Sequence, residues 1–171
     1  MFPNTYLRRL IVPLIFEVLL GMTVGMVDTM MISSAGEAAV SGVSLVDMIN
    51  NLILAILSAL ATGGAVVTGQ LLGAKRKQEA CLAANQLCYT AVLFGAALAG
   101  ISILLRRPLL RLLFGSIEED VMSNALIYLT ITSLSFPMLG LSNACSALFR
   151  SMGNSRITLK VSLAMNIVNV A

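Results

Sequence analysis

The sequence has no histidine, few cysteines and few charged residues. Charged residues make up 11% of the 171 positions, whereas a soluble domain carries about 25% to solvate its surface. The absence of histidine removes the usual zinc ligand and the commonest general base. Cys81, Cys88 and Cys145 lie in or beside apolar runs, where an odd number indicates packing rather than a disulfide framework. These absences argue against a soluble domain, a histidine-based zinc or catalytic site, and a disulfide scaffold.

Apolar residues are abundant and occur in long runs. They make up 58% of the chain, and the mean hydropathy is +0.93. Such runs, separated by short polar loops, predict an all-α membrane protein, a multi-helix transmembrane bundle of about five spans. A cleavable signal peptide is not expected, because Glu17 interrupts the first run and further runs follow. The expected spans, all within one lobe that covers residues 1–171, are residues 10–32, 40–72, 80–105, 121–149 and 157–171.

The basic residues predict the orientation of the chain in the membrane. A cytoplasmic N-terminus leaves outside only Arg106, Arg107 and Arg111, in a mixed-charge connector with an expected interfacial turn at Pro108 to Phe114. This bias favours an N-terminus inside, although the connector weakens it. The basic clusters are not interleaved with aromatic residues, so the expected partner is the lipid bilayer and not nucleic acid. The residues then placed inside are Arg8, Arg9, Lys75, Arg76, Lys77, Arg150, Arg156 and Lys160.

Two carboxylates interrupt the first apolar stretch, Leu10 to Ile32. Glu17 and Asp28 are eleven residues apart, which returns them to within about 20° of each other on one helix face. Gly21 and Gly25 share that face. An acid near mid-membrane costs roughly 2.5–3.5 kcal/mol, so it needs a partner or a function. We therefore expect this face to turn toward protein or water and to line a transport path.

The two acids differ in what their positions indicate. A carboxylate in a low-dielectric site, as expected for Asp28, can load and release a proton or ligate Na⁺. The alternative is an acid near the helix end that snorkels or pairs with a basic residue. Glu17 lies nearer the cytoplasmic side, where water or Arg8 and Arg9 can reach it, so a structural and a functional role both stay open. Apart from Na⁺ at Asp28, no metal site is predicted.

Two further polar stripes are candidates for lining a cavity or binding the ion. In the second run, the residues within about 60° of one another are Asp47, Asn51, Ser58 and Thr62. Asp47 fits helix capping or a polar network as well as ion binding. In the last segment, Ser162, Asn166 and Asn169 share one face. Amide oxygens can ligate Na⁺ or hydrogen-bond a protonated acid, and the alternative is hydrogen bonding between helices.

Other patterns are less informative. The methionines of the first span fit an adaptable wall for apolar cargo or a lipid-facing surface; they are Met22, Met26, Met30 and Met31. The pairs Gly21/Gly25 and Gly69/Gly73 fit the packing of small residues between helices. The sequence contains no nucleotide-binding loop, metal-ligand spacing or nucleophile–base pair, so neither an enzyme nor a cofactor is expected.

Four stretches in series resemble a known family. They read PLIFEVLLGMTVGMVDTMMIS, AVSGVSLVDMINN, SALATGGAVVTGQLLGAK and ALFRSMGNSRITL. In this order and spacing they resemble the N-terminal part of the bacterial multidrug and toxic compound extrusion (MATE) transporters. The resemblance covers essentially the whole chain. It implies a twelve-helix antiporter of two six-helix lobes, of which this chain is an N-terminal fragment comprising most of one lobe.

The resemblance also implies a function and a site. Such transporters expel organic cations and drugs in exchange for H⁺ or Na⁺. Asp28, within VDT, matches a family aspartate that takes part in cation binding, and Asn169 matches an asparagine partner on the fifth helix. A second partner four residues later falls beyond Ala171. The expected partners are cationic drugs and the missing remainder of the transporter, and the expected location is the cytoplasmic membrane.

Two other functions remain as alternatives. One is a lipid-linked oligosaccharide flippase of the same superfamily, for which we expect a more basic cavity, whereas the mid-span charges here are acidic. The other is a non-transporting truncated membrane subunit that only packs against a partner.

Overall fold

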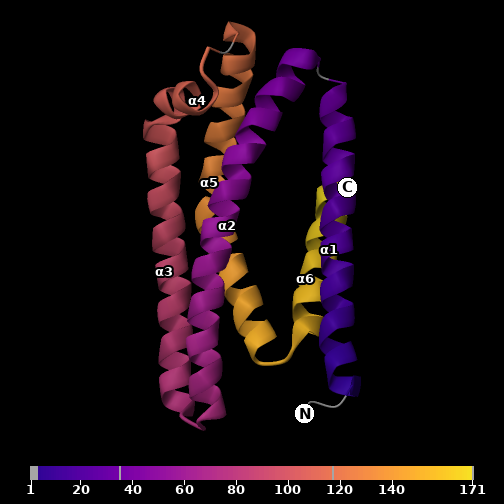
Figure 1. The fold of residues 1–171 in the computed structure, drawn as a ribbon, viewed down its shortest axis with the longest axis vertical. Helices are drawn as coiled ribbons and strands as arrows, with labels where there is room; N and C mark the ends of the chain where they lie inside the picture. The colour runs from indigo at the N-terminus through magenta and orange to yellow at the C-terminus, as the bar shows by residue number, and fades with distance from the viewer. Residues whose placement is uncertain (1–3, 35, 117, 171) are drawn as a thin grey trace.

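The computed structural model describes residues 4–34, 36–116 and 118–170 (Figure 1). The side chains outside this description are those of residues 4–10, Glu17, Val24, Asp28, Thr29, Ser155, Arg156 and residues 165–170. The secondary structure of the described part is helical throughout, which confirms the predicted all-α class. Its helices are α1 (Asn4–Ser33), α2 (Glu37–Gly73), α3 (Lys77–Leu104), α4 (Arg106–Phe114), α5 (Glu119–Ser151) and α6 (Ser155–Val170).

In the described part, four helices are long and apolar enough to cross a membrane. These candidate spans are Ile11–Ser33, Glu37–Gly73, Lys77–Leu104 and Glu119–Ser151. They coincide with the first four expected spans to within a few residues. The fifth expected span falls on α6, whose 16 residues are not among the candidate spans.

The connector between α3 and α5 is more ordered than the sequence indicated. Where an interfacial turn was expected at Pro108 to Phe114, the chain forms the nine-residue helix α4. Pro108 is tolerated because it lies in the first turn, where a backbone N–H has no partner within the helix. In Figure 1, α4 lies across the end of α3, next to the start of α5.

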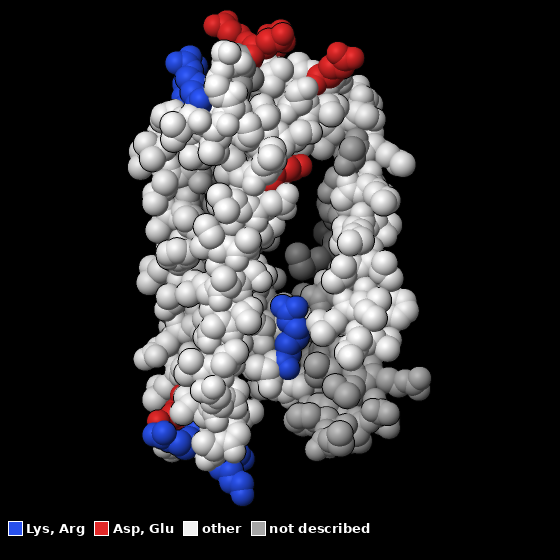
Figure 2. All heavy atoms as spheres, viewed as in Figure 1, with Lys and Arg blue, Asp and Glu red and all other residues white. Residues whose placement is uncertain are grey.

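The helices form two groups. α2, α3 and α5 pack against one another, whereas α1 packs mainly against α6. Figure 1 shows α1 and α6 running in the same direction along the long axis, linked to the other group through α2 and α5. Figure 2 shows an opening between the α1–α6 pair and the other helices. This opening is the candidate location of a transport path.

Small residues hold the α2–α3–α5 group tightly together. A Cβ atom added at Gly95 of α3 would lie 2.6 Å from the carbonyl oxygen of Phe136 on α5. One added at Gly140 of α5 would lie 2.6 Å from the carbonyl oxygen of Ala91 on α3. The α3 and α5 backbones therefore touch, and close packing of this kind is a main source of helix association in a membrane.

Charges collect at the two ends of the molecule. In Figure 2, acidic side chains gather at the end where α4 meets α5 and α1 meets α2, with basic ones beside them on the α4 side, and further basic side chains lie at the opposite end and beside the opening. The basic end includes the exposed residues Lys75 and Lys77, and Arg76, which forms an ion pair of 2.6 Å with Glu79. Between the ends, the charged side chains seen in this view border the opening, and the outer surface of the helices is uncharged. This distribution is typical of a protein whose middle lies in hydrocarbon and whose ends lie in water.

Candidate transport site

A small pocket lies where α1, α2 and α5 meet. Its volume is about 160 Å³. Asp47 is half-buried in its wall. No lysine or arginine is present among the described residues that line it, so the charge they contribute is negative. These residues are Gly25 and Ile32 from α1, Val40, Val43, Ser44 and Asp47 from α2, and Tyr128 from α5.

Asp47 has a hydrogen-bond donor in the pocket wall. The Tyr128 hydroxyl donates to Oδ1 of Asp47 over 3.3 Å, which joins α5 to α2. Sequence reasoning identified Asp47 and missed Tyr128. The available signal was a tyrosine within an apolar span, because a buried tyrosine hydroxyl usually needs a partner.

The rest of the predicted α2 stripe follows Asp47 along the helix. Asn51, Ser58 and Thr62 are exposed in this chain, on the face that borders the pocket by the count of about 100° per residue. The Thr62 hydroxyl donates to the Ser58 carbonyl oxygen over 2.8 Å, within α2 itself. These residues lie away from the α3 and α5 contacts of α2, and their cavity-lining role stays a prediction.

One further amide on α2 escaped the sequence analysis. Among the described residues, Oδ1 of Asn50 is buried without a hydrogen-bond partner. A buried acceptor in this state costs roughly 1–3 kcal/mol. Asn50 lies three residues beyond Asp47 on the same helix and is not among the residues that line the pocket.

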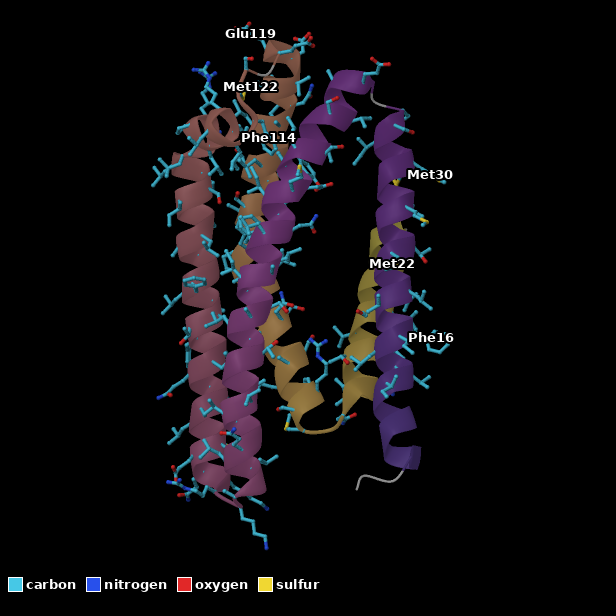
Figure 3. The ribbon with its side chains drawn as sticks, in the orientation of Figure 1. Phe16, Met22, Met30, Phe114, Glu119 and Met122 are labelled. Atoms are coloured by element: carbon cyan, nitrogen blue, oxygen red, sulfur yellow. The ribbon has the colours of Figure 1, made fainter. Side chains whose placement is uncertain are left out.

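α1 presents different faces to the pocket and to the outside. Phe16, Met22 and Met30 point away from the other helices in Figure 3, and their exposed fractions are 55%, 60% and 73%. Gly25, by contrast, lines the pocket. The outward methionines have the exposure expected of a lipid-facing surface.

The predicted ion ligands lie on two helices that pack against each other, α1 and α6. The side chains of Asp28 and Glu17 on α1, and of Asn166 and Asn169 on α6, lie outside the described residues. The structure thus brings the two helices together, and ligation of an ion between these side chains stays a prediction.

The comparison with known families decides the identity of the fold. The family model MatE matches residues 13–171. The chain belongs to the MatE family. This confirms the resemblance found in the sequence, and it makes the protein part of a multi-pass membrane transporter and not an enzyme.

Two similar proteins are longer than this chain. It is 31% identical over 160 residues to the "Uncharacterized transporter YisQ" of Bacillus subtilis (strain 168). This match covers 93% of this chain and 34% of that protein. It is similar, at 16% identity and a TM-score of 0.84, to the structure of a MOP superfamily transporter from Pyrococcus furiosus. That likeness covers 92% of this chain and 34% of the other, and shows the fold. The MatE-family chain thus spans about a third of the length of these relatives.

Proposed function

We propose that this MatE-family chain is the N-terminal portion of a cation-coupled multidrug antiporter. The whole transporter would export organic cations and drugs across the cell membrane in exchange for H⁺ or Na⁺. The observation that supports cationic cargo is the pocket between α1, α2 and α5, where the described lining includes the carboxylate of Asp47 and no basic side chain. Attraction between charges strengthens as the surroundings become less polar, so such a pocket favours a cation.

The coupling ion is proposed to bind at Asp28, with Asn169 as a second ligand and with Asn166 and Glu17 as further candidates. Support comes from the packing of α1 on α6, the helices that carry these residues. Because α1 has its main contacts with α6 and few with the other group, the α1–α6 pair can shift as a unit. Proton or Na⁺ binding at Asp28 would change the position of α1, and hence the shape of a pocket that Gly25 and Ile32 help to line.

The sign of the charge on the transported molecule needs its own test. The Pyrococcus furiosus relative is described as having a binding pocket of reverse polarity, which suggests a different function for that transporter. A flippase for lipid-linked oligosaccharides would similarly require basic groups to hold phosphate. The described lining around Asp47 contains none, which supports organic cations over that alternative.

The experiment uses the full-length transporter in proteoliposomes, with Na⁺ and proton gradients imposed separately. We expect one gradient to drive export of a cationic dye and neither to drive an anionic dye. Asp28→Asn should abolish gradient-driven export without lowering the amount of protein. Asp120→Asn, which removes an exposed acid in the first turn of α5, is the matched control and should export normally. Normal coupled export by Asp28→Asn would refute the coupling role.

The orientation is proposed to have the N-terminus in the cytoplasm. Support comes from the basic end of the molecule, where Lys75, Arg76 and Lys77 form the link between α2 and α3. Positively charged short loops are retained on the cytoplasmic side of the membrane.

A further inference from the structure

The helix α4 lies where the chain is expected to leave the hydrocarbon. It follows α3, whose candidate membrane span ends at Leu104, and Figure 1 shows it across the end of that helix. One side of α4 is fixed to the bundle, because Leu110 is fully buried and Phe114 packs against the same core cluster. Its other side carries Leu112, which is 85% exposed. An amphipathic helix at this level lies in the plane of the membrane surface.

The three arginines of α4 have different surroundings. Nη1 of Arg106 donates to the Thr130 hydroxyl oxygen over 3.1 Å, which ties that side chain to α5. Arg107 and Arg111 are one helical turn apart and line a hollow of about 740 Å³ between α4 and the start of α5. Among the described residues, the ion pair found is Arg76 with Glu79, so neither arginine of the hollow has a carboxylate within 4.0 Å.

The rest of the hollow has both polar and apolar lining residues. Ser116, Glu119 and Ser123 supply polar groups, and Met122 supplies apolar surface. In Figure 3, Phe114 and Met122 lie at the junction of α4 and α5, and Glu119 lies at the end of α5. Among the described lining residues are two guanidinium groups and one carboxylate, so these side chains have a net positive charge.

The position of the arginines within α4 gives a reason to expect an anion. Arg106 and Arg107 begin the helix, and its first turn contains no acidic residue. Positive side chains at a helix N-terminus are disfavoured by the helix dipole. A phosphate bound between Arg107 and Arg111 would reduce the repulsion between their guanidinium groups.

We propose that Arg107 and Arg111 bind the phosphate of an anionic phospholipid of the phosphatidylglycerol type. An arginine guanidinium matches a phosphate through paired N–H donors. The hydroxyls of Ser116 and Ser123 can add donors, and the glycerol hydroxyls of the headgroup can donate to the Glu119 carboxylate. The exposed Leu112 would then contact the acyl chains below the headgroup. This site is separate from the pocket at Asp47 and does not depend on the transported cargo.

The site also accounts for a weakness in the charge pattern of the sequence. The arginines of α4 fall on the proposed outer side, against the general bias of basic loops toward the cytoplasm. A specific contact with lipid phosphate gives these side chains a role at the outer surface.

Native mass spectrometry of the full-length transporter in detergent tests the proposal. Phosphatidylglycerol and phosphatidylcholine are offered at equal concentration to the wild type, to Arg107→Gln/Arg111→Gln, and to Lys75→Gln/Lys77→Gln. The last variant loses the same charge at the opposite end of the molecule. The first double variant should lose a roughly tenfold or greater preference for phosphatidylglycerol, since each basic residue near an anionic headgroup contributes about a factor of five. The lysine variant should keep that preference.

Three results would overturn the site. They are an equal affinity of the wild type for both lipids, an unchanged preference in the arginine variant, and an equal loss in the lysine variant. Soluble glycerol phosphate is added in a separate arm, and its binding as tightly as the lipid would assign the hollow to a free phosphate ester instead.

A second measurement needs no variant. Phosphatidylglycerol with a photoreactive acyl chain is cross-linked to the wild-type transporter, and the labelled peptides are sequenced. The label should concentrate between Leu104 and Ser123. Labelling spread evenly over the other helices would contradict the proposal even if the arginine variant failed to fold.

Discussion

Asp47 combines two properties that can be separated by substitution: a negative charge in a pocket wall and an acceptor for a hydrogen bond. The carboxylate is half-buried and faces no basic side chain in the described lining of the pocket. Tyr128 donates to it and thereby ties α5 to α2. The charge bears on cation affinity, whereas the hydrogen bond bears on the packing of the two helices.

We predict that Asp47→Asn and Tyr128→Phe affect different properties of the full-length transporter. Asp47→Asn keeps an acceptor oxygen and removes the charge, so KM for a cationic dye should rise roughly tenfold, equivalent to about 1.4 kcal/mol. Tyr128→Phe keeps the charge and removes the donor, so it should lower stability by about 0.5–1.5 kcal/mol. Dye transport and melting temperature in detergent measure the two effects.

The separation of these effects is the point of the test. A rise in KM with Tyr128→Phe as large as that with Asp47→Asn would mean that the hydrogen bond, and not the charge, controls cargo binding. An unchanged KM with Asp47→Asn would remove Asp47 from the cargo site.

Asp47 could be singled out from the sequence, because one acid in a long apolar run is conspicuous. Tyr128 could not be assigned to it, since the two residues are 81 positions apart and their contact depends on where α5 crosses α2. The same holds for Asn50, whose buried oxygen is a result of helix packing. At the scale of single residues, the sequence thus identifies costly groups but does not identify their partners.

At the scale of helices, the apolar runs locate the spans better than they locate the helix ends. The run expected at residues 80–105 is the helix Lys77–Leu104, and the one expected at 121–149 extends to Glu119–Ser151. Hydropathy reports what lies in hydrocarbon, whereas a helix continues into polar residues wherever its backbone hydrogen bonds can continue. For the same reason α4, with three arginines among nine residues, was expected only as a turn.

Helix packing was also harder to predict than helix position. Of the glycine pairs noted in the sequence, one member lies against a neighbouring helix: a Cβ at Gly69 would lie 3.5 Å from Cβ of Ser151 on α5. A Cβ at Gly21, Gly25 or Gly73 would meet nothing within 4 Å. The shortest distances to the backbone of another helix are at Gly95 and Gly140, one on each of α3 and α5, and Gly42 of α2 comes next, at 3.0 Å from backbone atoms of α5. Spacing along one helix does not reveal which of its glycines face a neighbouring helix.

We predict that Gly95→Ala destabilises the bundle while Gly100→Ala does not. The new Cβ at position 95 would lie 2.6 Å from the Phe136 carbonyl oxygen and 2.9 Å from Cα of Pro137, both parts of the α5 backbone. Because backbone cannot move aside as a side chain can, α3 and α5 must separate, at a cost of about 1–3 kcal/mol. The melting temperature in detergent measures this loss.

Gly100 provides the control within the same helix. A Cβ added there would meet nothing within 4 Å, and alanine favours a helix over glycine by about 1 kcal/mol. Gly100→Ala should therefore melt at the same or a higher temperature. Equal losses for the two variants would show that helix propensity, and not the α3–α5 contact, sets the response.

At the scale of the molecule, the two groups of helices have different degrees of attachment. α2, α3 and α5 share a core of buried side chains such as Ile53 and Leu129, whereas α1 and α6 pack mainly on each other. Transporters of this general kind work by moving packed bundles around a central site. The chain spans about a third of the length of its relatives. Movement of this lobe against a second bundle must therefore be tested in the full-length protein.

The orientation of the lobe leads to a prediction that native cysteines can test. Cys81 is exposed near the start of α3, next to the basic link of Lys75 to Lys77. With the N-terminus inside, this end of the molecule faces the cytoplasm. A membrane-impermeant maleimide should then label Cys81 in inside-out vesicles and leave it unlabelled in intact cells. Cys81→Ser should abolish that labelling, because Cys88 and Cys145 are partly buried within the apolar helices.

The opposite end of the molecule supplies the complementary test. Ser116 is exposed between α4 and α5, so Ser116→Cys in the Cys81→Ser background should be labelled in intact cells. The two sites must respond oppositely, because an odd number of membrane crossings separates them when α3 spans the bilayer and α4 lies on its surface. Labelling of Cys81 in intact cells would show that the lobe has the opposite orientation, with the arginines of α4 on the cytoplasmic side. Labelling of both sites from the same side would contradict the assignment of α3 as a span.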